Sequence, residues 1–239
     1  MQLSFIFISN KNGNAGLFVS PPRISAGFNS LSPQGYEALR IEVEKLTNQR
    51  IHIFGASGSG TTTIAKNISE KFGYEHFDTD NYYWYPTEMP FTEARPVDER
   101  LQLMKTDLEN HDKWILSGSL DGWGDPLIPL FELVIFVYVP QSVRIERLRE
   151  RELKRYGKEA LSGGSRYESA KEFIEWAAGY DSGLLPGRSL LRHEKWIAGL
   201  ECEVIKIINI SLSESINLVI NSIIDWENPH VKTKPFQRT

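Results

Sequence analysis

The sequence predicts an α/β fold with three layers, in which helices cover both faces of a mostly parallel β-sheet. Short apolar runs alternate with amphipathic stretches from about residue 50 onward, and this alternation is typical of chains built from strand–helix–strand units. The run LVIFVYV at 133–139 is apolar throughout, as expected for a strand that is covered on both faces. Hydrophobic residues make up 41% of the chain and charged residues 24%, a balance that can supply the buried core of such a fold.

The individual elements follow from these two patterns. The predicted strands are the apolar runs at 50–54, 74–78, 113–117, 133–139 and 203–209. The predicted helices are the stretches in which apolar residues recur at helical spacing, at 61–72, 96–110, 141–155, 169–180, 188–199 and 213–225.

The N-terminal part differs in composition from the rest of the chain. Residues 10–35 are rich in Gly, Asn, Ser and Pro, so we expect a flexible N-terminal extension over 1–35. A helix is expected to begin near Ser32 and Pro33, with the serine as its N-cap. The remaining residues, 36–239, are predicted to form one domain.

Charge, cysteine content and hydropathy exclude several classes of protein. The net charge of −4 at pH 7 argues against nucleic acid as a partner, because phosphate contacts need a basic surface. Cys202 is the only cysteine, which excludes a disulfide within the chain and a cysteine-rich metal site. No apolar run approaches the roughly 20 residues that span a bilayer, and the first residues lack the pattern of a signal peptide. We therefore expect a cytoplasmic protein without a membrane partner, while its oligomeric state is left open.

A glycine-rich segment follows the strand predicted at 50–54. It consists of Gly55, Ala56, Ser57, Gly58, Ser59, Gly60, Thr61 and Thr62. The segment matches the phosphate-binding pattern G-x-x-x-x-G-K-[ST] at every fixed position except Thr61, where the pattern has lysine. Between a strand and a helix, the N–H groups of such a loop and the helix N-terminus bind phosphate. We therefore predict a nucleotide site here, with Mg²⁺ held in part by the hydroxyl of Thr62; the alternative is a turn that only closes a strand–helix unit.

Two acids and two arginines are further candidates for the site. Asp78 and Asp80 lie at the carboxyl end of the second predicted strand, the edge at which open parallel sheets bind ligands. They are candidates for orienting an acceptor hydroxyl and for holding Mg²⁺, and the alternative for either is a turn or a helix cap. Arg147 and Arg151 share one face of the helix predicted at 141–155. The alternative for this helix is a solvated element whose charges pair with its own glutamates.

These segments together resemble the adenylate-kinase-like and shikimate-kinase-like P-loop kinases, which act on small molecules or nucleoside monophosphates. The resemblance rests on GASGSGTT, on Asp-Thr-Asp at 78–80 and on the P-x6-R-x3-R run that contains Arg147 and Arg151, and it extends over about residues 50–225. It implies the P-loop NTPase fold, with five parallel strands in the order 2-3-1-4-5 and a mobile helical lid at about 152–190. It also implies ATP as the co-substrate, Mg²⁺ as the cofactor, and contacts of these two arginines with the nucleotide or the phosphoryl group in transfer.

Two departures from the family pattern leave the function open between two hypotheses. Thr61 replaces the lysine, and Ser117 ends the third predicted strand where many relatives have an aspartate. Arg147 and Arg151 are the leading candidates for supplying the missing positive charge in the manner of an arginine finger. The next candidates are Arg188 and Arg192, at the end of the predicted lid and just beyond it. The favoured hypothesis is an ATP-dependent phosphotransferase acting on a small-molecule or nucleotide acceptor. The alternative is a degenerate relative that binds nucleotide as a regulatory module without catalysis; the sequence identifies neither the acceptor nor the base of the nucleotide.

Overall fold

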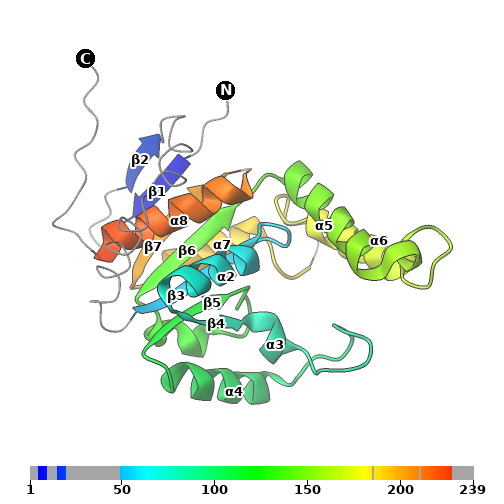
Figure 1. Ribbon diagram of the computed structural model, residues 1–239, viewed down its shortest axis with the longest axis horizontal. Coiled ribbons are helices and arrows are strands. Elements are labelled where there is room, and N and C mark those ends of the chain that lie inside the picture. Colours follow the sequence, from blue (N-terminus) through cyan, green and yellow to red (C-terminus); the bar gives the residue numbers. More distant parts are fainter. Residues whose placement is uncertain (1–4, 10–14, 20–48, 185, 210, 228–239) are drawn as a thin grey trace.

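A seven-stranded β-sheet forms the centre of the molecule, with its strands in the spatial order β2-β1-β7-β6-β3-β5-β4 (Figure 1). The computed structural model describes residues 5–9, 15–19, 49–184, 186–209 and 211–227. The parallel strands are β3 (Gln49–Gly55), β4 (Glu75–Asp78), β5 (Lys113–Ser117), β6 (Leu133–Tyr138) and β7 (Glu203–Ile208). Numbered among themselves along the chain, these strands have the order 2-3-1-4-5, so the predicted fold class and strand order are confirmed.

An N-terminal hairpin extends the parallel sheet by two antiparallel strands. β1 (Phe5–Ser9) pairs with β2 (Ala15–Val19) and, on its other side, with β7. Both strands lie within 1–35, for which the composition predicted no regular structure, so the two strands were not expected; flexibility of 1–35 stays a prediction. The backbone of β1 pairs with the N–H and C=O groups at the edge of β7, which would otherwise lack partners. The sequence NKNGN between β1 and β2 contains the Asn-Gly pair typical of hairpin loops. The helix expected near Ser32 lies outside the described residues.

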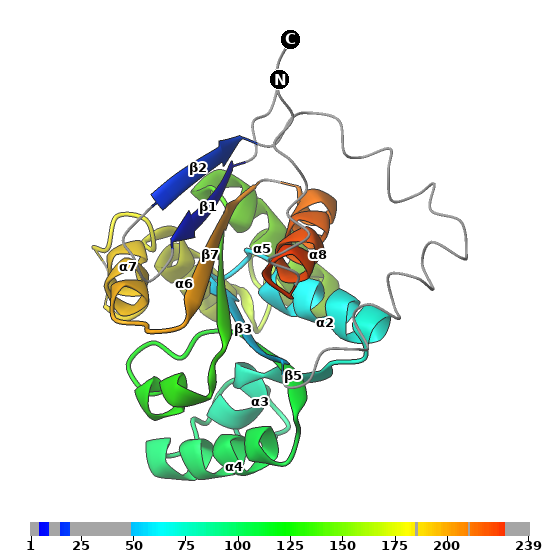
Figure 2. The same ribbon diagram turned by 90° about the vertical axis from the view of Figure 1, so that its left-hand side faces the viewer.

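Helices cover both faces of the sheet (Figures 1 and 2). One face carries α2 (Thr61–Phe72) and α8 (Leu212–Glu227), and the other carries α4 (Val97–Glu109), the 3-10 helix η1 (Asp125–Leu130) and α7 (Leu190–Ala198). On the first face, Ile64 and Val219 are fully buried against the strands, and on the second, Met104 is fully buried. The predicted three-layer arrangement follows from these two cores.

Strand β3 explains why the strands read as continuous apolar runs. Successive side chains of a strand point to opposite faces of the sheet. Ile51 and Ile53 therefore pack with α2 and α8, whereas His52 and Phe54 pack on the other face against Trp196 of α7. Because each face needs its own apolar side chains, the alternation of polar and apolar residues seen in half-exposed strands is lost.

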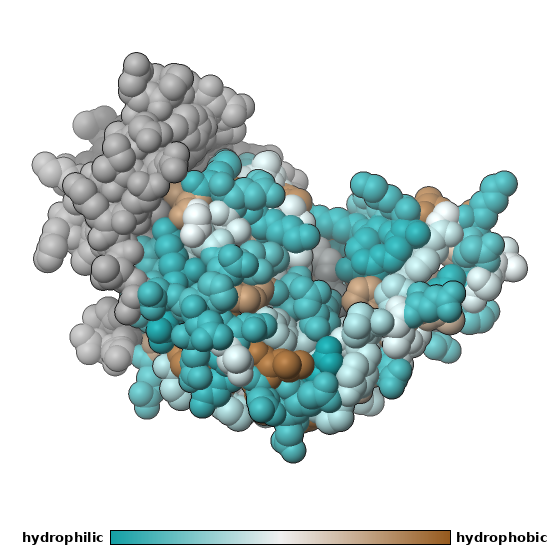
Figure 3. Space-filling view, turned by 60° about the horizontal axis from the view of Figure 1, so that its bottom comes forward, coloured by the Kyte–Doolittle hydropathy of each residue, from teal (hydrophilic) through white to brown (hydrophobic). Residues whose placement is uncertain are grey.

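The segment predicted as a lid forms an arm that projects from the body of the molecule (Figure 1). The arm contains the end of α5 (Gln141–Tyr156), the 3-10 helix η2 (Gly157–Ala160) and α6 (Tyr167–Ala178). Leu148 and Ala177 are buried between α5 and α6. Figure 3 shows the arm set off from the body by an indentation, on a face where hydrophilic residues prevail. Mobility of 152–190 stays a prediction.

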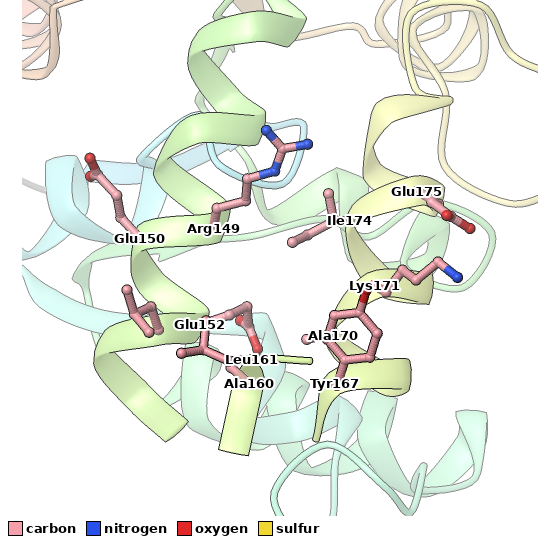
Figure 4. A pocket seen from close by; sticks show the side chains of 11 residues that line it. Arg149, Glu150, Glu152, Ala160, Leu161, Tyr167, Ala170, Lys171, Ile174 and Glu175 are labelled. Atoms are coloured by element: carbon pink, nitrogen blue, oxygen red, sulfur yellow. The ribbon is translucent and has the colours of Figure 1, made fainter. Parts of the chain in front are cut away.

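A pocket of about 460 Å³ lies within the arm, between α5, η2 and α6 (Figure 4). Ala170 and Ile174 belong to its apolar wall, and the charged side chains of Arg149 and Lys171 stand at its margin. None of its lining residues belongs to the glycine-rich segment 55–62, so this pocket is distinct from the predicted nucleotide site. Among the described residues, no helix combines the length and the apolar character that crossing a membrane requires.

Candidate nucleotide-binding site

The glycine-rich segment forms a tight loop between the end of β3 and the start of α2, as its sequence context predicts. Gly58 and Gly60 have φ angles of +84° and +89°, in a region that residues with a side chain rarely adopt. A Cβ atom on Gly55 would lie 2.4 Å from the carbonyl oxygen of Val137, and one on Gly58 would lie 2.7 Å from that of Arg144. The glycines are therefore required by the close approach of the loop to β6 and α5.

The loop offers free backbone donors to an anion. The N–H of Ser59 donates to the carbonyl oxygen of Ala56 at 3.0 Å, whereas the N–H groups of Ser57, Gly58 and Gly60 have no partner within the described part of the chain. Gly60 is the N-cap of α2 and supplies no side-chain cap, and the first turn of this helix carries no acidic residue. The unpaired N–H groups and the partial positive charge of the helix N-terminus are the features that bind phosphate.

Asp78 joins three elements beside the loop. Its Oδ2 atom accepts a hydrogen bond from the hydroxyl of Thr62 at 2.8 Å and one from that of Ser117 at 3.2 Å. Its Oδ1 atom accepts the N–H of Asp80 at 3.0 Å, which makes Asp78 the N-cap of the short helix α3 (Thr79–Tyr83). The structure therefore shows the cap that the sequence offered as an alternative, and it also shows a carboxylate next to the hydroxyl of the loop.

Asp80 lies in the first turn of α3, and its carboxylate is not part of the hydrogen-bond cluster around Thr62. The side chain is exposed to solvent, but nearby protein atoms raise its pKa by partly desolvating the charge, and Asp78 raises it further. The positive charges of Arg188 and Arg151 partly offset this rise. The charge of Asp80 is thus influenced by one arginine from the end of the predicted lid and by one from α5.

The four arginines that the sequence singled out divide into two pairs. Nη1 of Arg147 donates to the carbonyl oxygen of Gly58 at 3.3 Å, and Nη1 of Arg188 lies 3.5 Å from Oγ of Ser57. Arg151 instead pairs with Glu152 at 3.2 Å, and Arg192 pairs with Asp121 at 3.0 Å. Arg147 and Arg188 therefore contact the glycine-rich loop, while carboxylates hold the other two arginines.

Sequence reasoning missed Arg144 as a contact of the loop. This side chain is fully buried, and its guanidinium donates to the carbonyl oxygens of Val139, Ser57 and Ala177 and forms an ion pair with Asp181. It connects the loop, the end of β6 and the end of α6 through charge-assisted hydrogen bonds. Its sequence neighbours Val143 and Ile145 are apolar, and this placement was the available sign that Arg144 faces the interior.

Comparison of the chain with known proteins identifies its family. A model of the AAA domain family matches residues 51–172. The chain is 47% identical over 174 residues to the uncharacterized protein YqaC of Bacillus subtilis, covering 72% of this chain and 96% of that protein.

Cytidylate kinases are more distant relatives. The enzyme of Thermoplasma volcanium is 27% identical over 114 residues, covering 43% of this chain and 60% of the kinase. The enzyme of Natronomonas pharaonis is 32% identical over 117 residues, covering 44% of this chain and 59% of the kinase. The chain therefore spans less than two thirds of the length of these kinases.

Solved structures of kinases also resemble the chain. The shikimate kinase of Bacteroides thetaiotaomicron has a TM-score of 0.44 at 17% identity, over 74% of this chain and 97% of that chain. A gluconokinase of Sinorhizobium meliloti has a TM-score of 0.43 at 17% identity, over 78% of this chain and 98% of that chain. From the family match to residues 51–172 and the identity to YqaC, the chain belongs to the AAA domain family, and part of it is similar to cytidylate kinases.

Proposed function

We propose that this protein transfers the terminal phosphoryl group of ATP to a hydroxyl or phosphate group of a small-molecule or nucleotide acceptor. The observation that carries the proposal is the 2.8 Å hydrogen bond between Thr62, in the first turn of α2, and Asp78, at the end of β4. It brings a hydroxyl and a carboxylate to the side of a loop whose N–H groups are free to bind phosphate. Similarity to cytidylate kinases supports the same chemistry.

Thr62 and Asp78 would hold Mg²⁺. The Thr62 hydroxyl donates its hydrogen to Asp78 and keeps both lone pairs, and a hydroxyl with one carboxylate, completed by waters and phosphate oxygens, is a ligand set that this ion accepts. Among the described residues no three His, Cys, Asp or Glu side chains gather as a metal cluster, which also agrees with an ion held largely by nucleotide and water. When bound, Mg²⁺ neutralises charge on the phosphate oxygens.

Arg188 is the best candidate to replace the charge of the absent lysine. It lies 3.5 Å from Oγ of Ser57 in the loop, and its charge also acts on Asp80. Arg147 bonds instead to the carbonyl oxygen of Gly58, so it supports the backbone of the loop. A guanidinium between the phosphate-binding loop and an acidic residue can stabilise the phosphoryl group as it passes to the acceptor.

Asp80 would accept the proton of an acceptor hydroxyl. As the acceptor oxygen forms its bond to phosphorus, the bond between that phosphorus and the oxygen of ADP breaks, and the hydroxyl proton moves to the carboxylate. The raised pKa of Asp80 suits this role, because a carboxylate with a higher pKa is a stronger base. The positive charge of Arg188 acts on Asp80, which supports a position of this base near the transferred group.

Calorimetry with Mg-ATP and Mg-GTP tests the nucleotide site. In Gly60→Val, the new side chain sits at φ +89°, its Cβ lies 2.7 Å from Cδ1 of Leu212, and we expect it to obstruct the approach of a phosphate, so binding should be lost. Gly73→Val is the matched control, because Gly73 has φ +70° at the other end of α2 and no atom lies within 4 Å of its added Cβ. If the wild type binds neither nucleotide at millimolar concentration, the proposal is wrong.

A second candidate function is a nucleotide-binding regulatory module without catalysis. Thr61 in place of lysine and Ser117 in place of aspartate favour it, because both changes remove charge that acts in phosphoryl transfer. ADP production with a panel of nucleoside monophosphates and small hydroxy acids separates the two functions. Tight Mg-ATP binding with no turnover for any acceptor, and no effect of Asp80→Asn on binding, would favour the regulatory module.

A further inference from the structure

Three side chains of β4 and β5, those of His76, Ser117 and Asp78, form a chain of hydrogen bonds, which we call the relay. Nε2 of His76 lies 2.9 Å from Oγ of Ser117, which lies 3.2 Å from Oδ2 of Asp78, the atom that also accepts from Thr62. His76 and Asp78 are two residues apart on β4, so their side chains emerge on the same face of the sheet. Ser117 lies directly opposite Asp78 on β5 and is fully buried.

The single hydrogen of the Ser117 hydroxyl fixes the direction of this relay. Oγ can donate to Oδ2 of Asp78 or, at 3.5 Å, to the carbonyl oxygen of Phe77, and neither of these oxygens can donate in return. The bond to the carboxylate is the stronger one because it is shorter and charge-assisted. Ser117 must then accept from His76, which requires a hydrogen on Nε2 of the imidazole.

We propose that His76 is a positioning residue, which acts through Ser117 to hold the carboxylate of Asp78 against Thr62. This inference deepens the proposed function and rests on it. Strand β5 ends in Ser117, which has no charge, so the carboxylate beside the glycine-rich loop is that of Asp78 at the end of the neighbouring strand β4. Two donors on Oδ2 and one on Oδ1 restrict the rotation of that carboxylate, and an oriented ligand loses less entropy when it receives a cation.

Calorimetric titration of ATP, with and without Mg²⁺, measures this role without relying on turnover. The wild type should bind ATP more tightly with Mg²⁺ than without it. His76→Leu and Ser117→Ala should each lose about ten- to a hundredfold of that Mg²⁺-dependent gain, the size typical for partners of metal ligands, while affinity for metal-free ATP stays the same. His76→Gln should keep most of the gain, because its Nε2 can donate to Ser117 at a similar reach.

A double-mutant comparison shows whether His76 acts through Asp78. In an Asp78→Asn background, His76→Leu should cause no further loss of the Mg²⁺-dependent gain. An undiminished gain in both His76→Leu and Ser117→Ala would overturn the inference and leave the proposed function standing. Equal losses of metal-free and Mg²⁺-dependent affinity would assign His76 a purely structural role and also overturn it. If the wild type binds ATP in neither condition, the inference and the proposed function fail together.

Discussion

Two buried histidines should make the fold lose stability at mildly acidic pH. His52 on β3 is fully buried, and its ring lies 5.3 Å from the ring of Phe54 and 5.0 Å from that of Phe131. His193 on α7 is 1% exposed and bonds to the hydroxyl of Tyr180 at 2.8 Å. Burial lowers the pKa of His52 from 6.5 to about 4 and that of His193 from 6.5 to about 3.

The magnitude follows from the difference in bound protons between the two states. In the unfolded chain each histidine gains a proton as the pH falls through about 6.5, whereas the folded chain keeps both rings neutral down to pH 4 or below. The unfolded state is therefore favoured by about 1.4 kcal/mol per pH unit for each ring below pH 6.5. At pH 5 the loss is about 2 kcal/mol for each histidine and about 4 kcal/mol for both.

Urea unfolding at several pH values between 5 and 7.5 measures this loss. His52→Phe and His193→Phe should each lower the slope of unfolding free energy against pH between 5 and 6 by about 1.4 kcal/mol per unit. The change in the slope of unfolding free energy against pH reports only the titration of the histidine. Packing or hydrogen bonds that a variant loses lower the unfolding free energy by the same amount at every pH and leave the slope unchanged. His111→Gln controls for the loss of a histidine, since His111 is exposed. Wild-type slopes in both phenylalanine variants would refute the reasoning.

Three further predictions concern the site. Asp80→Asn should keep or raise the melting temperature, because partial desolvation and the nearby charge of Asp78 disfavour the ionised form of Asp80, while phosphoryl transfer falls by about 10² to 10⁴; parallel loss of stability and turnover would assign it a structural role. Arg188→Ala should lower the rate by about 10³ or more and change ATP affinity less, whereas Thr61→Lys should raise activity only slightly or lower it; wild-type turnover in Arg188→Ala contradicts the relocated charge. Hydrogen exchange over 152–190 should slow with a nonhydrolysable ATP analogue, and identical exchange with saturating analogue contradicts a lid.

Local patterns in the sequence were sufficient for most of the fold. The helix predicted at 61–72 begins and ends at these residues in the structure, since a glycine in the left-handed region stands at each end of it. The run at 133–139 forms β6, because an apolar stretch of this length is satisfied only when both of its faces are covered. The glycine-rich loop was also predictable, because its spacing encodes a backbone conformation and not a contact between distant residues.

The hairpin at the N-terminus and the partners of the charged side chains were decided by tertiary structure. The composition of the N-terminal part did not indicate β1 and β2. These strands pair at the free edge of β7, which comes about two hundred residues later in the chain. Spacing placed two arginines on one face of α5 but did not show that one of them reaches the loop and that the other pairs with a neighbouring glutamate.

The relay around Asp78 shows the physical reason for this division most clearly. The residues that meet there are separated along the chain by 16 residues between Thr62 and Asp78 and by 41 between His76 and Ser117. Helix and strand periodicity depends on neighbours a few positions apart, so the sequence by itself determined the elements and the conformation of the loop. Hydrogen bonds depend on distances of about 3 Å between elements, and only the packing of α2, β4 and β5 against one another sets those distances.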